Sequence, residues 1–187
     1  MTRKLLIAGC AVLALSAAAC SKKPETATPD ANPAATVPTP ANEAAAPDFA
    51  TKAAISDMFE IAASKVALER STNKEVKAFA QMMIDAHTAS TADLKAAIAA
   101  SGLTIPLPEA LPQDKADAVA DLQKADAKDF DKKFMDAQVD GHQAALDLMG
   151  RYGQDGTVQA IKDFALKTGP VVQTHLDKAK AIKDALK

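Results

Sequence analysis

Histidine is the residue of this sequence best suited to chemistry, and the chain contains three of them: His87, His142 and His175. At about 100° per residue, each lies within or at the edge of the apolar stripe of a predicted helix. An apolar stripe covers about a third of a helix surface, so chance would turn all three inward roughly once in thirty such sequences. The pattern indicates a shared place for the histidines in the interior of a helical domain.

One carboxylate is a candidate for the same interior. Glu60 projects among small side chains, where another helix could approach closely and bury it. This face lies beside the predicted main apolar stripe of its helix, formed by Ile55, Phe59, Ala62 and Val66. A solvent-facing Glu60 is the alternative, because the edges of a helical wheel are not sharp.

The height of these residues along the helices agrees with one shared site. At about 1.5 Å per residue, Glu60 and the three histidines all lie near mid-helix, although His175 is farther than His142 from the turn that joins their helices. Neutral imidazoles with a carboxylate suit Zn²⁺, Cu²⁺ or Fe²⁺ better than Ca²⁺ or Mg²⁺, which prefer oxygen ligands. We therefore predict a transition-metal or small-ligand site in the core, with Gln138 and Asp131 as supporting polar side chains.

A second interpretation of the same residues involves no ligand. Each imidazole could hydrogen-bond to a neighbouring helix, with Gln138, Ser90, Thr91 or Asp131 as partner. The histidines would then only stabilise the core of a structural or interaction protein. A mononuclear-metal oxidoreductase is a third alternative.

Several activities lack their sequence signatures. A di-iron oxidase needs Glu-x-x-His motifs, whereas the nearest approaches here, Asp85-Ala86-His87 and Asp140-Gly141-His142, have a spacing that places the two side chains on different helix faces. No GxSxG, HExxH, phosphate loop or CxxCH motif occurs. We therefore do not expect an enzyme, a nucleotide-binding protein or a haem protein, and we assign no catalytic residue. The net charge of −2 argues against nucleic acid, and no motif indicates a protein partner.

The elements that must position these residues are helices. The composition is rich in alanine, lysine and aspartate, with no tryptophan and no alternating β-type run. A capping box of Thr72 with Glu75 marks one helix start, Gly102 marks a helix end, and Gly169-Pro170 should bend the last helix. The predicted helices span 48–70, 72–102, 114–124, 126–152 and 157–187, the third being short and preceded by a link with three prolines.

These lengths predict an all-α, ferritin-like four-helix bundle in residues 48–187. Short links join the long helices into two antiparallel hairpins, and one long link joins the hairpins. A ferritin-like crossover and an up-down-up-down arrangement are both compatible with these links.

Three segments of the chain resemble the bacterial domain-of-unknown-function family 4142. They are DFATKAAISDMFEIAASKVALERSTNKEVKAFAQMMIDAHTASTADLKA, DFDKKFMDAQVDGHQAALDLM and VVQTHLDKAKAI. The resemblance implies a ferritin-like helical bundle of the outer membrane or periplasm and implies no established activity. The family's recurring polar positions correspond to Glu60, Asn73, His87, Asp131, His142 and His175, and Phe59 stands where the family more often has a smaller residue.

The N-terminus predicts an envelope location. A cationic start and an apolar run to Ala19 form a signal peptide, residues 1–19, too short to span a membrane. Ala17-Ala18-Ala19-Cys20 matches a lipoprotein cleavage site after a full-length apolar region, whereas cleavage before Cys10 would leave that region too short. We therefore predict a lipidated Cys20; ordinary cleavage with an unmodified Cys20 is the alternative.

Residues 20–47 form the predicted tether between lipid and domain. Six of the ten prolines lie between 21 and 47, with almost no large apolar side chain, so this segment should be a disordered spacer. Ser21, where an aspartate would favour the inner membrane, favours the outer membrane. The expected location is therefore the periplasmic face of the outer membrane of a Gram-negative bacterium.

Overall fold

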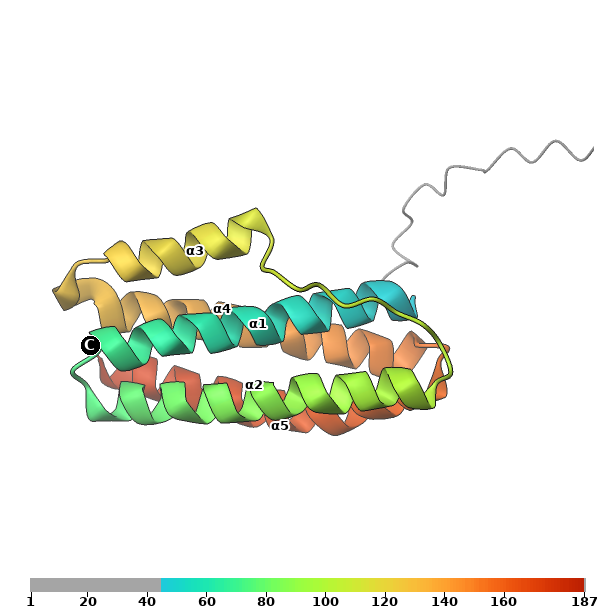
Figure 1. Cartoon of the computed structure of the whole chain (residues 1–187). Coiled ribbons are helices and arrows are strands. Elements are labelled where there is room, and N and C mark those ends of the chain that lie inside the picture. The colour runs from blue at the N-terminus through green and yellow to red at the C-terminus, as the bar shows by residue number, and fades with distance from the viewer. Residues whose placement is uncertain (1–44, 187) are drawn as a thin grey trace, which may run out of the picture. The chain divides into compact units, whose positions relative to one another are not determined.

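The computed structural model describes residues 45–186, so the signal peptide, Cys20 and most of the predicted tether lie outside the described residues. Residues 45–186 form five helices and no strand (Figure 1). The helices are α1 (Ala46–Arg70), α2 (Lys74–Ala100), α3 (Gln113–Lys124), α4 (Ala127–Asp155) and α5 (Gln159–Ala185). None of the helices in this part of the chain is long and apolar enough to cross a membrane.

Four long helices form the bundle, and α3 lies outside it. Helices α1 and α2 form one hairpin and α4 and α5 the other, with α1 also against α4 and α2 against α5. The link after α2 returns along the bundle to α3, so that α4 starts at the same end as α2 and runs parallel to it (Figure 1). Helices α2 and α4 therefore face each other across the diagonal of the bundle.

Helix α3 is fastened at its C-terminal end, mainly to α1. The guanidinium of Arg70, the last residue of α1, donates hydrogen bonds to the backbone oxygens of Gln123 and Ala125. The same guanidinium lies 5.3 Å from the centre of the Phe130 ring in α4. The last backbone carbonyls of a helix have no hydrogen-bond donor within that helix, and Arg70 supplies a charged donor to them at the end of α3.

Most predicted helix boundaries agree with the structure within two residues, and the exceptions have local causes. Asn73, and not Thr72, caps α2: its Oδ1 accepts from the backbone N–H groups of Glu75 (2.8 Å) and Val76 (3.3 Å). Gly102 has the positive φ of 71° that favours glycine after a helix end. Helix α4 continues past Gly153 to Asp155, whereas α5 runs through Pro170 as the single helix predicted.

Helix α1 buries only part of the predicted stripe, namely Phe59 and Val66. Ile55 and Ala62, assigned to its main stripe, are only partly buried. Seven further buried positions recur alternately four and three residues apart, the spacing of a helix seam that packs on neighbouring helices. They are Ala46, Ala50, Ala53, Asp57, Glu60, Ser64 and Ala67.

A polar layer divides the core of the bundle into two apolar clusters. Each long helix carries apolar side chains near both of its ends and buried polar groups between them. The Phe79 cluster includes Phe59, Val76, Phe79, Met83, Phe130, Phe134, Met135 and Ile182. The Phe49 cluster includes Phe49, Leu94, Ile98, Leu148, Tyr152, Ile161 and Phe164. The buried polar layer consists of Asp57, Glu60, His87, Gln138, His142 and His175.

Candidate metal centre

His87, on α2, is held by a carboxylate of the neighbouring helix. Its Nδ1 lies 2.7 Å from Oδ1 of Asp57 on α1, and both residues are buried. The hydroxyl of Thr91 lies 3.0 Å from the other Asp57 oxygen. Because a carboxylate accepts hydrogen bonds, Nδ1 of His87 donates, and in the neutral ring Nε2 keeps its lone pair. Nε2 of His87 is buried without a hydrogen-bond partner.

His142, on α4, is oriented in the same way by backbone. Its Nδ1 lies 2.8 Å from the backbone oxygen of Gln138, one turn earlier. A carbonyl can only accept, so Nδ1 of His142 carries the proton and Nε2 is free as a ligand. Nε2 is also buried without a partner. A hydrogen bond of this kind on the far ring nitrogen is the usual support of a metal-binding histidine.

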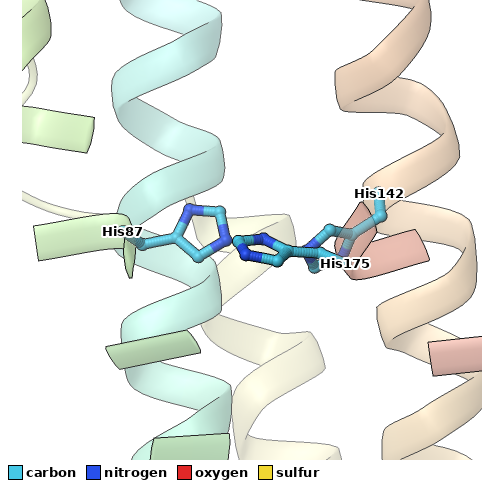
Figure 2. A group of neighbouring side chains, drawn as sticks. All are labelled: His87, His142 and His175. Atoms are coloured by element: carbon cyan, nitrogen blue, oxygen red, sulfur yellow. The ribbon is translucent and has the colours of Figure 1, made fainter. Parts of the chain in front are cut away.

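His175, on α5, completes the group, and its Nδ1 is the third buried ring nitrogen without a partner. Figure 2 shows the three imidazole rings turned toward one another from their separate helices. Ring centres are 5.6 Å apart for His87–His142 and His142–His175, and 6.1 Å apart for His87–His175. With one ligand nitrogen taken from each ring, all three nitrogens lie within 4.8 Å of one another.

This spacing can accept a metal ion after a small contraction. A tetrahedral metal with bonds of about 2.0–2.1 Å needs ligand nitrogens about 3.4 Å apart. The largest nitrogen–nitrogen distance of 4.8 Å must therefore shorten by about 1.4 Å when a metal binds. The buried His87, His142 and His175 cluster can thus hold a metal ion. A shared site requires this proximity, and the structure provides it.

The electrostatics keep two of the three imidazoles neutral, so that each can bind a cation. Burial, followed by the charge of His87, lowers the pKa values of His142 and of His175 to about 4, so both are neutral at pH 7. Burial also disfavours the charged form of His87, but the hydrogen bond to Asp57 and the charges of Glu60 and Asp57 outweigh it and raise the pKa of His87. A metal would replace the second proton of His87, keeping a positive charge opposite Asp57.

Glu60, on α1, lies beside the histidines and not among the converging nitrogens. Its Oε1 is 3.8 Å from Nδ1 of His142, the nitrogen bonded to backbone, and its Oε2 accepts a 2.6 Å hydrogen bond from Nε2 of Gln138. Burial raises the pKa of Glu60 to about 7. A β-carbon at position 141 would lie 2.8 Å from Glu60 Oε1, so Gly141 gives this carboxyl its place against α4.

The remaining predicted site residues fall in different places. Gln138 is fully buried and contacts both Glu60 and His142. Asp131 does not support the cluster: it precedes His142 by 11 residues on α4, about 16 Å along the helix axis. Cys20 lies outside the described residues.

Sequence reasoning missed Asp57, the carboxylate that supports His87. Its signal was the alternating spacing of α1, which places Asp57 on the same buried seam as Glu60, three residues earlier. His175 reaches the level of His142 because the turn between α4 and α5 comes later than predicted. His142 lies 13 residues before Asp155 and His175 lies 16 residues after Gln159, so the two heights nearly match.

The sequence of this chain matches a known family model. The chain belongs to the family described as Domain of unknown function (DUF4142), whose profile matches residues 31–182. The match begins within the predicted tether and covers nearly the whole bundle. Neither the curated proteins nor the solved structures contain a match to this chain.

Proposed function

We propose that this protein binds one divalent transition metal ion, Zn²⁺, Cu²⁺ or Fe²⁺, through His87, His142 and His175. Two observations carry the proposal: one nitrogen from each of the three buried rings lies within 4.8 Å of the other two, and each ring has a buried nitrogen without a hydrogen-bond partner. Buried polar atoms are nearly always paired, so three unpaired ones at one point favour a shared ligand. Imidazole nitrogen suits these borderline ions, whereas Ca²⁺ and Mg²⁺ prefer oxygen.

The supporting contacts agree with this role. Asp57 and the backbone oxygen of Gln138 each fix one ring so that its other nitrogen faces the cluster centre. All four bundle helices contribute, since Asp57 lies on α1 and the histidines lie on α2, α4 and α5. A metal ion bound here would join the two hairpins at the middle of the core.

The wider setting we propose is a lipid-anchored binding protein of the bacterial envelope. A lipobox at Cys20 and a proline-rich spacer support attachment to the outer membrane, with the bundle in the periplasm. The parallel direction of α2 and α4, joined by a long crossover, supports a ferritin-like topology. Binding is favoured over catalysis because the sequence has no motif of an enzyme class.

A structural role for the histidines is the second candidate function. The hydrogen bonds of His87 to Asp57 and of His142 to Gln138 would favour it, because they satisfy part of each imidazole. In that role, exchange of a histidine for an apolar residue of similar size would be neutral or stabilising. The two roles therefore differ in what His87→Leu does to metal content and to stability.

The test is metal analysis of protein purified without a chelator and without a histidine tag. We expect one metal ion per chain, or its uptake when Zn²⁺, Cu²⁺ or Co²⁺ is added to stripped protein. At a free metal concentration of 100 times Kd, binding adds about 2.7 kcal/mol to the free energy of unfolding. His87→Leu should abolish both the stoichiometry and this stabilisation.

Gln143→Leu is the matched control, because this exposed residue directly follows His142 on α4. It should bind metal as the unchanged protein does. Absence of any bound metal, with unfolding curves that do not respond to the three ions, would establish the structural role instead.

A further inference from the structure

Three protein ligands leave a metal ion with at least one open coordination position. Among residues 45–186, three ligand nitrogens converge at the cluster and no carboxylate joins them. Zinc with three protein ligands takes a fourth from outside the protein, and copper and iron take more. The surroundings of the three histidines therefore decide which external ligand can bind.

A small cavity lies against two of the three histidines. It has a volume of about 40 Å³ and is lined by His87 and His175, with Asp57 and Ser56 from α1. The small side chains of Ala53, Ala86 and Ala145 leave this room. A water molecule needs about 10–15 Å³ of such volume, so the cavity has room for about three non-hydrogen atoms.

The cavity reaches the surface between α2 and α5. Its outer lining includes Ser90 from α2 and Thr168 and Val171 from α5. Ser90 and Thr168 are partly exposed, and the Val171 side chain is 48% exposed. A small molecule therefore has a short route from solvent to His87 and His175.

A larger cavity on the other side does not reach the histidines. The groove between α1 and α4 has a volume of about 530 Å³ and contains Lys115, Arg151 and Leu148 in its lining. It extends inward to Glu60 and is lined by none of the three histidines. Larger molecules that enter this groove meet the Glu60 carboxyl instead of the cluster.

We propose that the open position of the bound metal faces the 40 Å³ cavity and selects exogenous ligands of two or three non-hydrogen atoms. This inference rests on the proposed metal binding. The cavity lining is mostly apolar, and its one charged residue, Asp57, is engaged with His87. The chemical class is therefore a diatomic or triatomic molecule, neutral or with a single negative charge that the metal itself balances.

The test uses Cu²⁺-loaded or Co²⁺-loaded protein with azide as the small probe and 1-methylimidazole as the large one. Visible absorption reports ligands that enter the coordination sphere. Azide should change the spectrum with saturation, and 1-methylimidazole at the same concentrations should leave it unchanged. Equal binding of the two probes, or fully loaded protein that ignores azide, would overturn the inference.

Filling the cavity gives a second, independent readout. Ser90→Leu should raise the Kd for azide at least tenfold with metal stoichiometry unchanged, whereas the exposed neighbour Ala89→Leu should have no effect. Thr168→Leu fills the same cavity from α5 and replaces Ser90→Leu if that variant does not fold. Azide affinity unchanged in the filled variants would refute the route. Loss of metal from all proteins, the unchanged chain included, would instead refute the proposed function.

Discussion

Gly141→Ala tests the packing that places Glu60 beside the histidines. Gly141 lies in the interior of α4, and a β-carbon there would lie 2.8 Å from Glu60 Oε1. Ordinary van der Waals contact begins near 3.4 Å, so something must move by about 0.6 Å. The carboxyl cannot move freely, because Glu60 is 1% exposed and its other oxygen is hydrogen-bonded to Gln138 at 2.6 Å.

Two opposing effects set the expected magnitude. Overpacking of a well-packed interior costs about 1–3 kcal/mol. Replacement of glycine by alanine within a helix returns about 1 kcal/mol. We therefore expect Gly141→Ala to lower the free energy of unfolding by about 1 kcal/mol, within a range of roughly 0–2 kcal/mol.

Gly150 on the same helix provides the control. A β-carbon there would meet nothing within 4 Å, so Gly150→Ala should stabilise the protein by up to about 1 kcal/mol. The assay is urea unfolding of the metal-free proteins, followed by far-ultraviolet circular dichroism. The two alanine variants should differ by about 1–3 kcal/mol, with Gly150→Ala the more stable.

A double-mutant cycle assigns the cost to Glu60. In a Glu60→Ala background the close contact is gone, so Gly141→Ala should then stabilise the protein as Gly150→Ala does. Equal stability of Gly141→Ala and Gly150→Ala in the unchanged background would refute this account of Gly141. The same holds if the cost of Gly141→Ala persists without the Glu60 carboxyl.

Three further predictions concern charge, metal support and location. Burial raises the pKa of Glu60 from 4.5 to about 7. The protonated Glu60 carboxyl therefore gives its full contribution to the stability of metal-free protein below pH 4.5, and this contribution is lost as pH rises through 7. In urea unfolding across pH, Glu60→Gln should remove this loss of about 3 kcal/mol. Asp57→Asn should weaken metal binding about 10–100-fold in calorimetric titration, because Asp57 supports the His87 ring. The control variant Asp131→Asn should bind metal normally. Equal effects of the two variants would contradict the support we assign to Asp57. Cys20→Ala should move the protein from the membrane fraction to the soluble fraction or stall its processing. Cys10→Ala, inside the predicted signal peptide, should change neither the fraction nor the processing. Membrane attachment of Cys20→Ala would contradict lipidation.

The sequence allowed the helices to be predicted because their signals are local. Proline and glycine mark the links, and the 3.6-residue period marks the buried stripes, so five helical segments were identified close to their observed bounds. The last helix continues through Pro170 as predicted, and Thr174 donates a 3.0 Å hydrogen bond to the backbone oxygen of Pro170. The relative order of the hairpins depends on contacts distant in sequence, and the link lengths left it open.

The inward direction of the three histidines was predictable, but their partners were not. Direction follows from the apolar neighbours of each histidine on its own helix. The distance between His87 and Asp57 depends on how α1 and α2 are rotated against each other, which a single helix pattern does not specify. The seam of α1 that contains Asp57 consists largely of alanine, so its hydrophobic signal is weaker than that of the neighbouring face with larger side chains.

The polar layer also fixes how far each helix may slide along the others. Alanine-rich seams offer little resistance to such sliding, because similar small side chains recur along them. A displacement of α2 by one turn, about 5.4 Å, would carry His87 away from Asp57 and bury both groups without partners. Each unpaired group would cost about 1–3 kcal/mol, a large share of the stability of a typical domain. Even before any ligand binds, the mid-core polar layer therefore fixes the register of the helices along the bundle axis.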